Sequence, residues 1–112
     1  MDAPELSARV RELVTDPGND VLVSAVVGWE IAIKRTLGRL TFIGTVADAV
    51  KEEGFTPLPV CLAHTDGLAA LPLLHRDPFD RLLIAQARVE GVPLVSRDPA
   101  IQAYEGLAVL WG

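Results

Sequence analysis

Cysteine is almost absent from this 112-residue sequence, in which Cys61 is the only one. A single thiol excludes an internal disulfide and any metal cluster built from several thiolates. No apolar run approaches the roughly 18 residues that a membrane-spanning helix needs, and the first residues lack the basic and apolar regions of a signal peptide. We therefore expect a protein of the reducing cytoplasm that makes no contact with membranes.

An excess of positive charge is lacking as well. The sequence has 10 Lys and Arg residues against 15 Asp and Glu residues, for a net charge of −5, whereas proteins that hold nucleic acid by bulk charge are basic. The basic residues gather in two stretches, residues 34–39 and 76–97, which is compatible with local basic strips and equally with solvated helix faces. Dinucleotide-binding glycine motifs, phosphate-binding loops and the nucleophile elbow of hydrolases are also absent.

Half of the residues are hydrophobic, which is typical of one globular domain over residues 1–112. Apolar runs and glycine stops predict strands at 21–25, 55–60, 93–96 and 107–111, and helices at 7–14, 26–37, 45–53, 62–71 and 78–90. Pro57 and Pro59 place the second strand near an edge. The alternation predicts an α/β domain with a mostly parallel sheet. Such domains usually open with a strand, often the central one, and this sequence opens with a helix.

Acidic residues follow the predicted strands or open the helices near the carboxyl edge of the sheet, where ligands of open parallel sheets bind. They are Glu30, Asp77, Asp80 and Asp98. Clustered carboxylates repel one another and are costly to desolvate, so a cluster of them indicates a bound cation. With oxygen ligands alone that cation would be hard, Mg²⁺ or Mn²⁺. Such an ion activates a water and stabilises the charge of a phosphoryl-transfer reaction.

Three of these acids also have a purely structural interpretation. Asp77 stands three residues before Asp80 at the start of a helix, which is the pattern of an N-cap. Glu30 could pair with Lys34 one helical turn further on. Asp98 could cap the short turn that follows it. The sequence leaves both interpretations open for these residues.

The remaining candidates divide between site and core. Asp80 shares a helix face with Ile84 and Ala87, so we expect its side chain to point inward, which favours a functional role. Ser24, at the end of the first predicted strand, is expected to cap the next helix rather than to touch a ligand. Trp29 is expected to lie in the core rather than to offer a surface on which bases stack.

Three segments of the sequence closely resemble the PIN-domain family. They are VLVSAVVGWEIAIK at residues 21–34, HRDPFDRLLIAQA at residues 75–87 and LVSRD at residues 94–98. The resemblance runs over nearly the whole sequence and is greatest to the toxins of VapBC-type toxin–antitoxin pairs. It implies a three-layer α/β/α sandwich around a five-stranded parallel sheet, and an endoribonuclease that depends on Mg²⁺ or Mn²⁺.

The resemblance also implies roles for individual residues and for partners. Glu30, Asp80 and Asp98 match the catalytic, metal-binding acids of the family, Asp77 matches an additional metal-binding acid, and Ser24 matches a polar residue near the site. The implied partners are an RNA substrate, a cognate antitoxin that holds the enzyme inactive, and a second copy in a homodimer.

Two departures from the family pattern bear on activity. The family begins with a central strand that ends in an aspartate, a principal metal ligand, and this sequence begins after that point. We therefore expect the strand and its aspartate to be missing, because the start is placed too late, because the chain is truncated, or because the protein is an inactive remnant. At Val27 the family often has a serine, so one further polar contact is expected to be lost.

Two other functions compete with the ribonuclease. One is a catalytically silent module that keeps the surfaces for the antitoxin or for dimerisation. The other is a metal-dependent phosphatase or a signalling receiver domain, both of which normally need a lysine after a later strand. No lysine follows Lys51, which argues against this last alternative.

Overall fold

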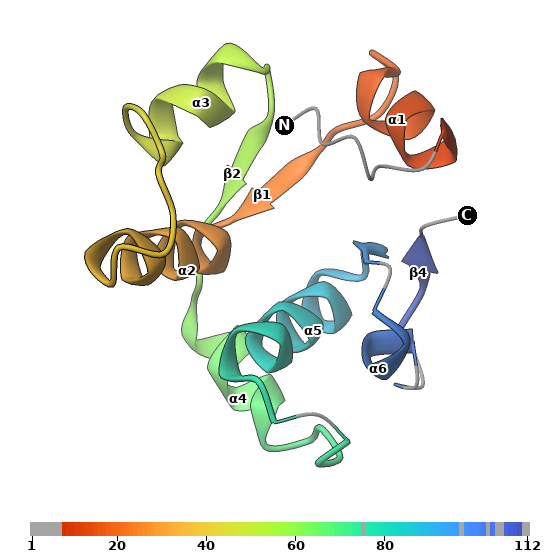
Figure 1. The fold of residues 1–112 in the computed structure, drawn as a ribbon. Helices are drawn as coiled ribbons and strands as arrows, with labels where there is room; N and C mark the ends of the chain where they lie inside the picture. The colour runs from red at the N-terminus through yellow and green to blue at the C-terminus, as the bar shows by residue number, and fades with distance from the viewer. Residues whose placement is uncertain (1–7, 75, 97, 103, 105–106, 111–112) are drawn as a thin grey trace.

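The computed structural model describes residues 8–74, 76–96, 98–102, 104 and 107–110. Parallel strands are interspersed with one or two helices at a time along the chain (Figure 1), which confirms the α/β class predicted from the sequence. In chain order the elements are α1 (Ala8–Thr15), β1 (Leu22–Ser24), α2 (Ala25–Thr36), α3 (Val46–Glu52), β2 (Thr56–Leu58), α4 (Leu62–Leu68), α5 (Pro78–Glu90), β3 (Leu94–Val95), α6 (Pro99–Gln102) and β4 (Val109–Leu110).

The four described strands form two parallel pairs. β1 pairs with β2, with Leu22 opposite Thr56 and Ser24 opposite Leu58, and β3 pairs with β4 in the same parallel sense. No ladder joins the two pairs within the described part of the chain. Two strands alone are marginally stable in water, so each pair depends on the helices packed around it.

The strands are shorter than predicted, whereas the helices lie close to their predicted bounds. Ala25, predicted to end the first strand, is the first residue of α2, and Val21 lies before β1. Within the described residues β2 has β1 as its single neighbour, in agreement with the edge position that Pro57 and Pro59 indicate. α6, predicted only as a turn, is a helix of 4 residues, and Trp111, predicted to end the last strand, lies outside the described residues.

Caps explain why the helices begin and end where they do. Thr45 precedes α3, and its hydroxyl accepts a hydrogen bond from the backbone N–H of Asp48 at 3.1 Å. Gly91 ends α5 with a φ of 67°, in the left-handed region that glycine enters without steric cost. The sequence signals at both sites are local, which is why they predict the helix bounds well.

The hydrophobic core lies around α5, in the second half of the chain. Its buried members are Leu71, Ile84, Ala85, Ile101 and Tyr104. In the first half, Val10 of α1 and Val26 of α2 are buried outside this cluster. The two halves of the molecule therefore do not share one continuous buried cluster among the described residues.

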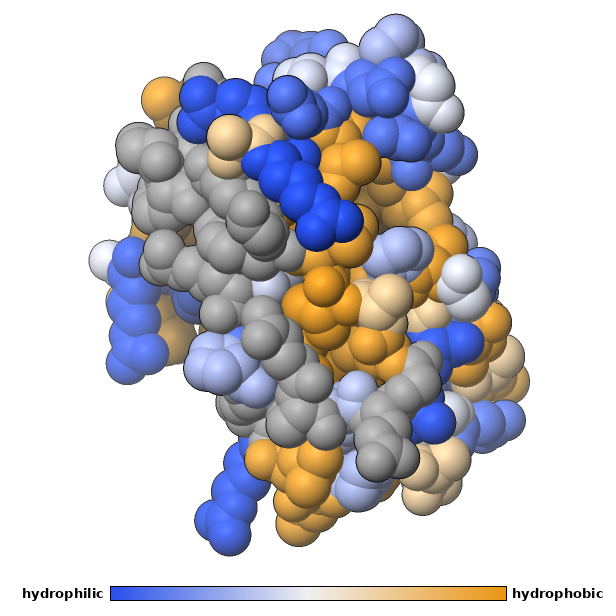
Figure 2. Space-filling model, turned by 90° about the vertical axis from the view of Figure 1, so that its right-hand side faces the viewer, coloured by the Kyte–Doolittle hydropathy of each residue, from blue (hydrophilic) through white to orange (hydrophobic). Residues whose placement is uncertain are grey.

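Much apolar surface stays in contact with solvent. Eight hydrophobic residues of the described chain are buried, although half of the sequence is hydrophobic. Figure 2 shows hydrophobic side chains gathered in the middle of one face of the molecule. The radius of gyration is 14.2 Å, compared with about 13 Å for a compact domain of this length. The molecule is thus more open than its composition leads one to expect.

Candidate active site

Ser24 fixes the start of α2 and thereby the position of Glu30. It is the last residue of β1 and the N-cap of α2, and its buried hydroxyl accepts a hydrogen bond from the backbone N–H of Val26 at 3.0 Å. The expected capping role of Ser24 is confirmed. Because α2 begins directly at the strand end, Glu30 lies in the second turn of a helix that leaves the carboxyl end of β1.

Glu30 forms the ion pair that the spacing indicated. Lys34 Nζ lies 3.0 Å from Glu30 Oε2, with the two side chains 50% and 31% exposed. An exposed pair of this kind contributes ~1 kcal/mol or less to stability. The structural interpretation of Glu30 is thus satisfied, and its carboxylate remains partly exposed to solvent.

Asp77 and Asp80 lie in the first turn of α5. Asp77 is the N-cap, and its Oδ1 accepts hydrogen bonds from the backbone N–H groups of Phe79 at 2.9 Å and Asp80 at 3.3 Å. The capping role of Asp77 is confirmed. Asp80 is partly buried, and Ile84 and Ala87 on its helix face are buried as predicted. Asp80 therefore lies at the border between core and solvent.

An aromatic contact joins the helices that carry Glu30 and Asp80. The rings of Trp29 and Phe79 lie edge to face, with centroids 4.4 Å apart and an interplanar angle of 66°. Each ring belongs to the residue immediately before one of the two acids, so the contact brings the start of α5 against α2. Trp29 is 47% exposed, and the expectation that it lies in the core is wrong.

Asp98 follows β3 and precedes α6, at the carboxyl end of the second strand pair. Its backbone N–H donates to Ser96 Oγ at 3.1 Å, and its carbonyl oxygen accepts from the N–H of Ile101 at 3.1 Å. These bonds fix the backbone at the end of β3. The neighbouring Arg97, and His75 before α5, lie outside the described residues.

The structure places the predicted acids on or next to helices α2, α5 and α6 but does not assemble them. Glu30 and Asp80 lie on helices in contact, Asp77 caps one of these helices, and Asp98 follows the other strand pair. Among the described residues no three His, Cys, Asp or Glu side chains are grouped closely enough to hold a metal ion. The arrangement thus offers accessible carboxylates without a complete ligand set.

A buried histidine that the sequence did not single out joins α4 to α5. The backbone N–H of Cys61 donates a hydrogen bond to His64 Nδ1 at 3.0 Å. Because Nδ1 accepts, the hydrogen of the imidazole is on Nε2, which donates to Glu90 Oε2 at 2.8 Å. Gln86, also buried, donates to the carbonyl oxygen of Pro59 at 3.1 Å. The three-residue spacing from Cys61 to His64 is a capping pattern. This spacing is the sequence signal from which the role of His64 could have been predicted. Its role is structural.

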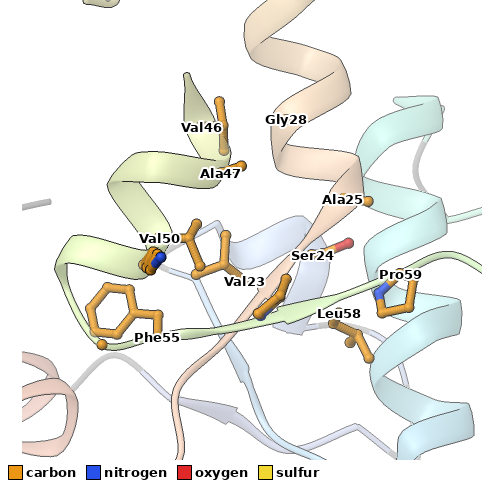
Figure 3. A pocket seen from close by; sticks show the side chains of 13 residues that line it. Val23, Ser24, Ala25, Gly28, Val46, Ala47, Val50, Phe55, Leu58 and Pro59 are labelled. Atoms are coloured by element: carbon orange, nitrogen blue, oxygen red, sulfur yellow. The ribbon is translucent and has the colours of Figure 1, made fainter. Parts of the chain in front are cut away.

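A cavity of about 700 Å³ lies between the β1–β2 pair and helices α2 and α3 (Figure 3). Its lining is apolar, with Val23, Val50, Phe55 and Leu58 among the contributors, and Lys51 is its one charged residue. None of the four predicted acids lines it. The cavity is therefore separate from the predicted carboxylates of α2 and α5.

Comparison with known proteins identifies a matching protein family. The family model described as PIN domain matches residues 1–107, a range that includes all four predicted acids. No curated protein matches the chain. In the part of the chain that the structure describes, none of the helices has the length and apolar character to cross a membrane.

Proposed function

The chain belongs to the PIN-domain family, and we propose that it is a metal-dependent endoribonuclease of the VapC type, the toxin of a toxin–antitoxin pair. PIN domains are in general metal-dependent nucleases. The proposal is narrower in four respects. The substrate is RNA, the ion is Mg²⁺ or Mn²⁺, a cognate antitoxin holds the enzyme inactive, and two copies associate as a dimer.

The observation that carries the proposal is the contact between the helices of Glu30 and Asp80. These acids match the family positions, and the Trp29–Phe79 contact holds their helices together at 4.4 Å between ring centroids. The contact brings the first turn of α5, which carries Asp80, against α2, which carries Glu30, and this supports the proposal of a shared carboxylate site.

The donor chemistry fits a hard cation, and the arrangement in the described residues is one ligand or more short of a metal centre. All candidates are carboxylates, the ligands that Mg²⁺ and Mn²⁺ prefer, but no group of three forms among the described residues. Glu30 is paired with Lys34 at 3.0 Å, and Asp77 is engaged as a cap. A further carboxylate is needed to draw the others together.

We assign Glu30, Asp80 and Asp98 as the catalytic acids that hold the ion, with Asp77 as an additional metal-binding acid. When bound, such an ion activates a water and stabilises the charge that develops on the phosphate. The chain's own part is positioning. Ser24 and Asp77 fix the helix starts through their caps, and Trp29 with Phe79 fixes the spacing of the two helices.

The further carboxylate is proposed to come from a fifth strand between β1 and β3, at the centre of the sheet, as in the family. Three observations support this. The described strands form two separate parallel pairs, the core contains few buried apolar residues, and the radius of gyration exceeds that of a compact domain. A central strand would join the pairs into one parallel sheet and bury apolar surface from both sides.

One specific observation favours the alternative of a catalytically silent module. Glu30 and Asp77 already have protein partners, and no group of three metal-binding side chains exists among the described residues. Such a module would keep the surfaces for an antitoxin or a second copy and would lack cleavage. The experiment below distinguishes it from the enzyme.

The test is RNA cleavage with Mn²⁺ by the chain and by a form extended upstream through the proposed strand, each compared with variants. Glu30→Gln, Asp80→Asn and Asp98→Asn keep the shape of the side chain and remove its charge. Cleavage by the extended form should fall by orders of magnitude in each variant, with the melting temperature unchanged or raised, because repulsion between carboxylates is relieved.

Asp77→Asn is the matched control in the same experiment. Asn caps a helix as well as Asp does, so this variant should fold normally and lose less activity than Asp80→Asn. If Asp80→Asn and Asp98→Asn both cleave at the parent rate, the assignment of these acids as the catalytic site is wrong. If no form cleaves RNA while a dimer or an antitoxin complex still forms, the silent module is correct.

A further inference from the structure

The cavity between the β1–β2 pair and helices α2 and α3 has the size of a small-molecule site. Its volume of about 700 Å³ lies within the range of roughly 300–1,000 Å³ that is usual for ligand pockets. Two strands and two helices surround it (Figure 3), so it is a hollow with walls rather than a flat apolar face. Such a hollow suits a small molecule better than a second protein, whose stable contact buries about 1,200 Å² or more.

Apolar side chains line the cavity and are left partly exposed. Four of them are Val23 of β1, Val50 of α3, Phe55 and Leu58 of β2. Gly28 of α2 also lines the cavity, and a Cβ at this position would meet its nearest neighbour at an ordinary 3.8 Å. Covering apolar surface with an apolar ligand is favourable because it removes that surface from water. The lining therefore favours a ligand whose greater part is a hydrocarbon.

Among the described residues that line the cavity, two carry a polar side chain, Lys51 and Ser24. Figure 3 shows Val50, which Lys51 follows, and Phe55 at one end of the cavity, and Ser24 toward the other. The hydroxyl of Ser24 already accepts a hydrogen bond at 3.0 Å in the cap of α2. Lys51 is exposed and has no ion pair within the described part of the chain, where no Asp or Glu lines the cavity. The charge at the Lys51 end thus complements an anionic group.

We propose that the cavity binds a straight-chain carboxylic acid of the fatty-acid type, with its carboxylate at Lys51 and its alkyl chain extended over Val23 toward Ser24. An exposed lysine covers apolar surface with its stem and keeps its ammonium group in water, so the carboxylate lies at the mouth and the chain is buried. An exposed ion pair contributes little, and the affinity comes mainly from the buried chain. The cavity is separate from the predicted acids, so this proposal does not depend on the proposed function.

A series of chain lengths tests whether the ligand lies in a space of limited size. Calorimetric titration measures binding of carboxylates from hexanoate to tetradecanoate, below their micelle concentrations, to the 112-residue chain and to the form extended upstream. Each added CH₂ should raise the affinity about threefold to fourfold until the cavity is filled, after which longer acids should gain nothing. An affinity that rises through the whole series would show binding to open apolar surface and would overturn the proposal. Binding that is lost in the extended form would also overturn it, because the added segment would then fill the cavity.

Lys51→Met tests the site of the carboxylate. This variant should bind decanoate about twofold to fivefold more weakly than the parent, the range expected for an exposed ion pair, and should bind decanol as the parent does. Arg39→Met is the matched control, because Arg39 is an exposed basic residue that does not line the cavity, and it should bind decanoate normally. Equal affinity of the parent for decanoate and for decyltrimethylammonium would show that no anion is recognised, contrary to the proposal.

Two further variants fill the cavity from opposite walls. Ala47→Leu on α3 and Gly28→Leu on α2, both at lining positions, should weaken decanoate binding at least about tenfold and shorten the longest acid that gains affinity, because each displaces several CH₂ groups. Leu62→Ala, on α4 at a residue that is 79% exposed and outside the lining, is the control and should bind as the parent does. Thermal melting identifies the filling variant that is folded. Parent affinity in a folded filling variant, or a loss of affinity in Leu62→Ala, would place the ligand elsewhere and refute the site.

Discussion

Lys34 and Glu30 form an ion pair at the residue that is proposed to hold a divalent cation. Their atoms lie 3.0 Å apart, and both side chains are partly exposed. A lysine at this distance occupies the carboxylate oxygen that a metal ion would need. At the scale of single residues, the ammonium group and the metal therefore compete for one ligand.

Replacing Lys34 by methionine removes this competitor. We expect Lys34→Met to raise Mn²⁺ affinity by up to about fivefold, and to change the free energy of unfolding by less than ~1 kcal/mol, because an exposed pair contributes little. Calorimetric titration with Mn²⁺ measures the affinity, and urea unfolding measures the free energy of unfolding. Lys51→Met, at the other lysine of the sequence, next to the apolar cavity, should leave the affinity unchanged. Equal Mn²⁺ affinities in the parent, Lys34→Met and Glu30→Gln would show that Glu30 is not a ligand.

Residue roles set by near neighbours in sequence could be predicted, and roles set by distant neighbours could not. The caps at Ser24 and Asp77 follow from short local patterns and are confirmed. The exposure of Trp29 depends on what α5 leaves uncovered on α2, which a helical pattern does not contain. The partnership of His64 with Glu90 spans 26 residues, and no local signal indicates it.

At the scale of elements, two glycines differ in whether their position could accept a side chain. Gly28 lies inside α2, where a Cβ would meet Val46 Cγ1 at an ordinary 3.8 Å. Gly91 ends α5 with a φ of 67°, which side chains rarely adopt. One position tolerates alanine and the other does not.

We expect Gly28→Ala to stabilise the protein by about 0.5–1 kcal/mol, since alanine restricts the unfolded chain and favours a helix. Gly91→Ala should destabilise it by about 1–2 kcal/mol, the cost of a left-handed conformation for a residue with a Cβ. Urea unfolding of both variants measures the two effects. A loss of stability in Gly28→Ala would mean that α2 packs on α3 more tightly than the structure shows.

The helices were easier to predict than the strands for a physical reason. A helix makes its hydrogen bonds within one segment, so caps and glycine stops fix its bounds, and α5 begins and ends where the sequence predicts. A strand exists only where a partner lies beside it. β3 and β4 are thus limited to the 2 residues each that pair with one another, although longer apolar runs surround them.

At the scale of the whole molecule, no ladder joins the two strand pairs among the residues that the structure describes, and the buried core found there is small for the composition. Apolar side chains remain in view on the surface of Figure 2. Exposed strand edges and apolar faces promote association with other chains. The family resemblance predicts the fold class, but it does not predict that the described strands form two separate pairs.

We expect the 112-residue chain by itself to be poorly soluble or self-associated, and the form extended upstream through the proposed strand to be monodisperse. The extended form should also show a higher melting temperature and a larger dependence of unfolding free energy on urea, because it buries more surface. Sedimentation and urea unfolding of both forms measure this. A monomeric, cooperatively melting 112-residue chain would show that the sheet is complete without a further strand.

The junction at Ser24 has a consequence for how sequences of this kind can vary in length. β1 ends at Ser24 and α2 begins at Ala25, so no connecting residue separates the pleat of a strand from the rotation of a helix. One inserted residue would turn the rest of α2 by roughly 100° about its axis, carrying Glu30 away from α5. Segments such as residues 37–45, between α2 and α3, have room to gain or lose residues. At the junction after β1, by contrast, an insertion or deletion would rotate every later side chain of α2, so we expect none to be tolerated there.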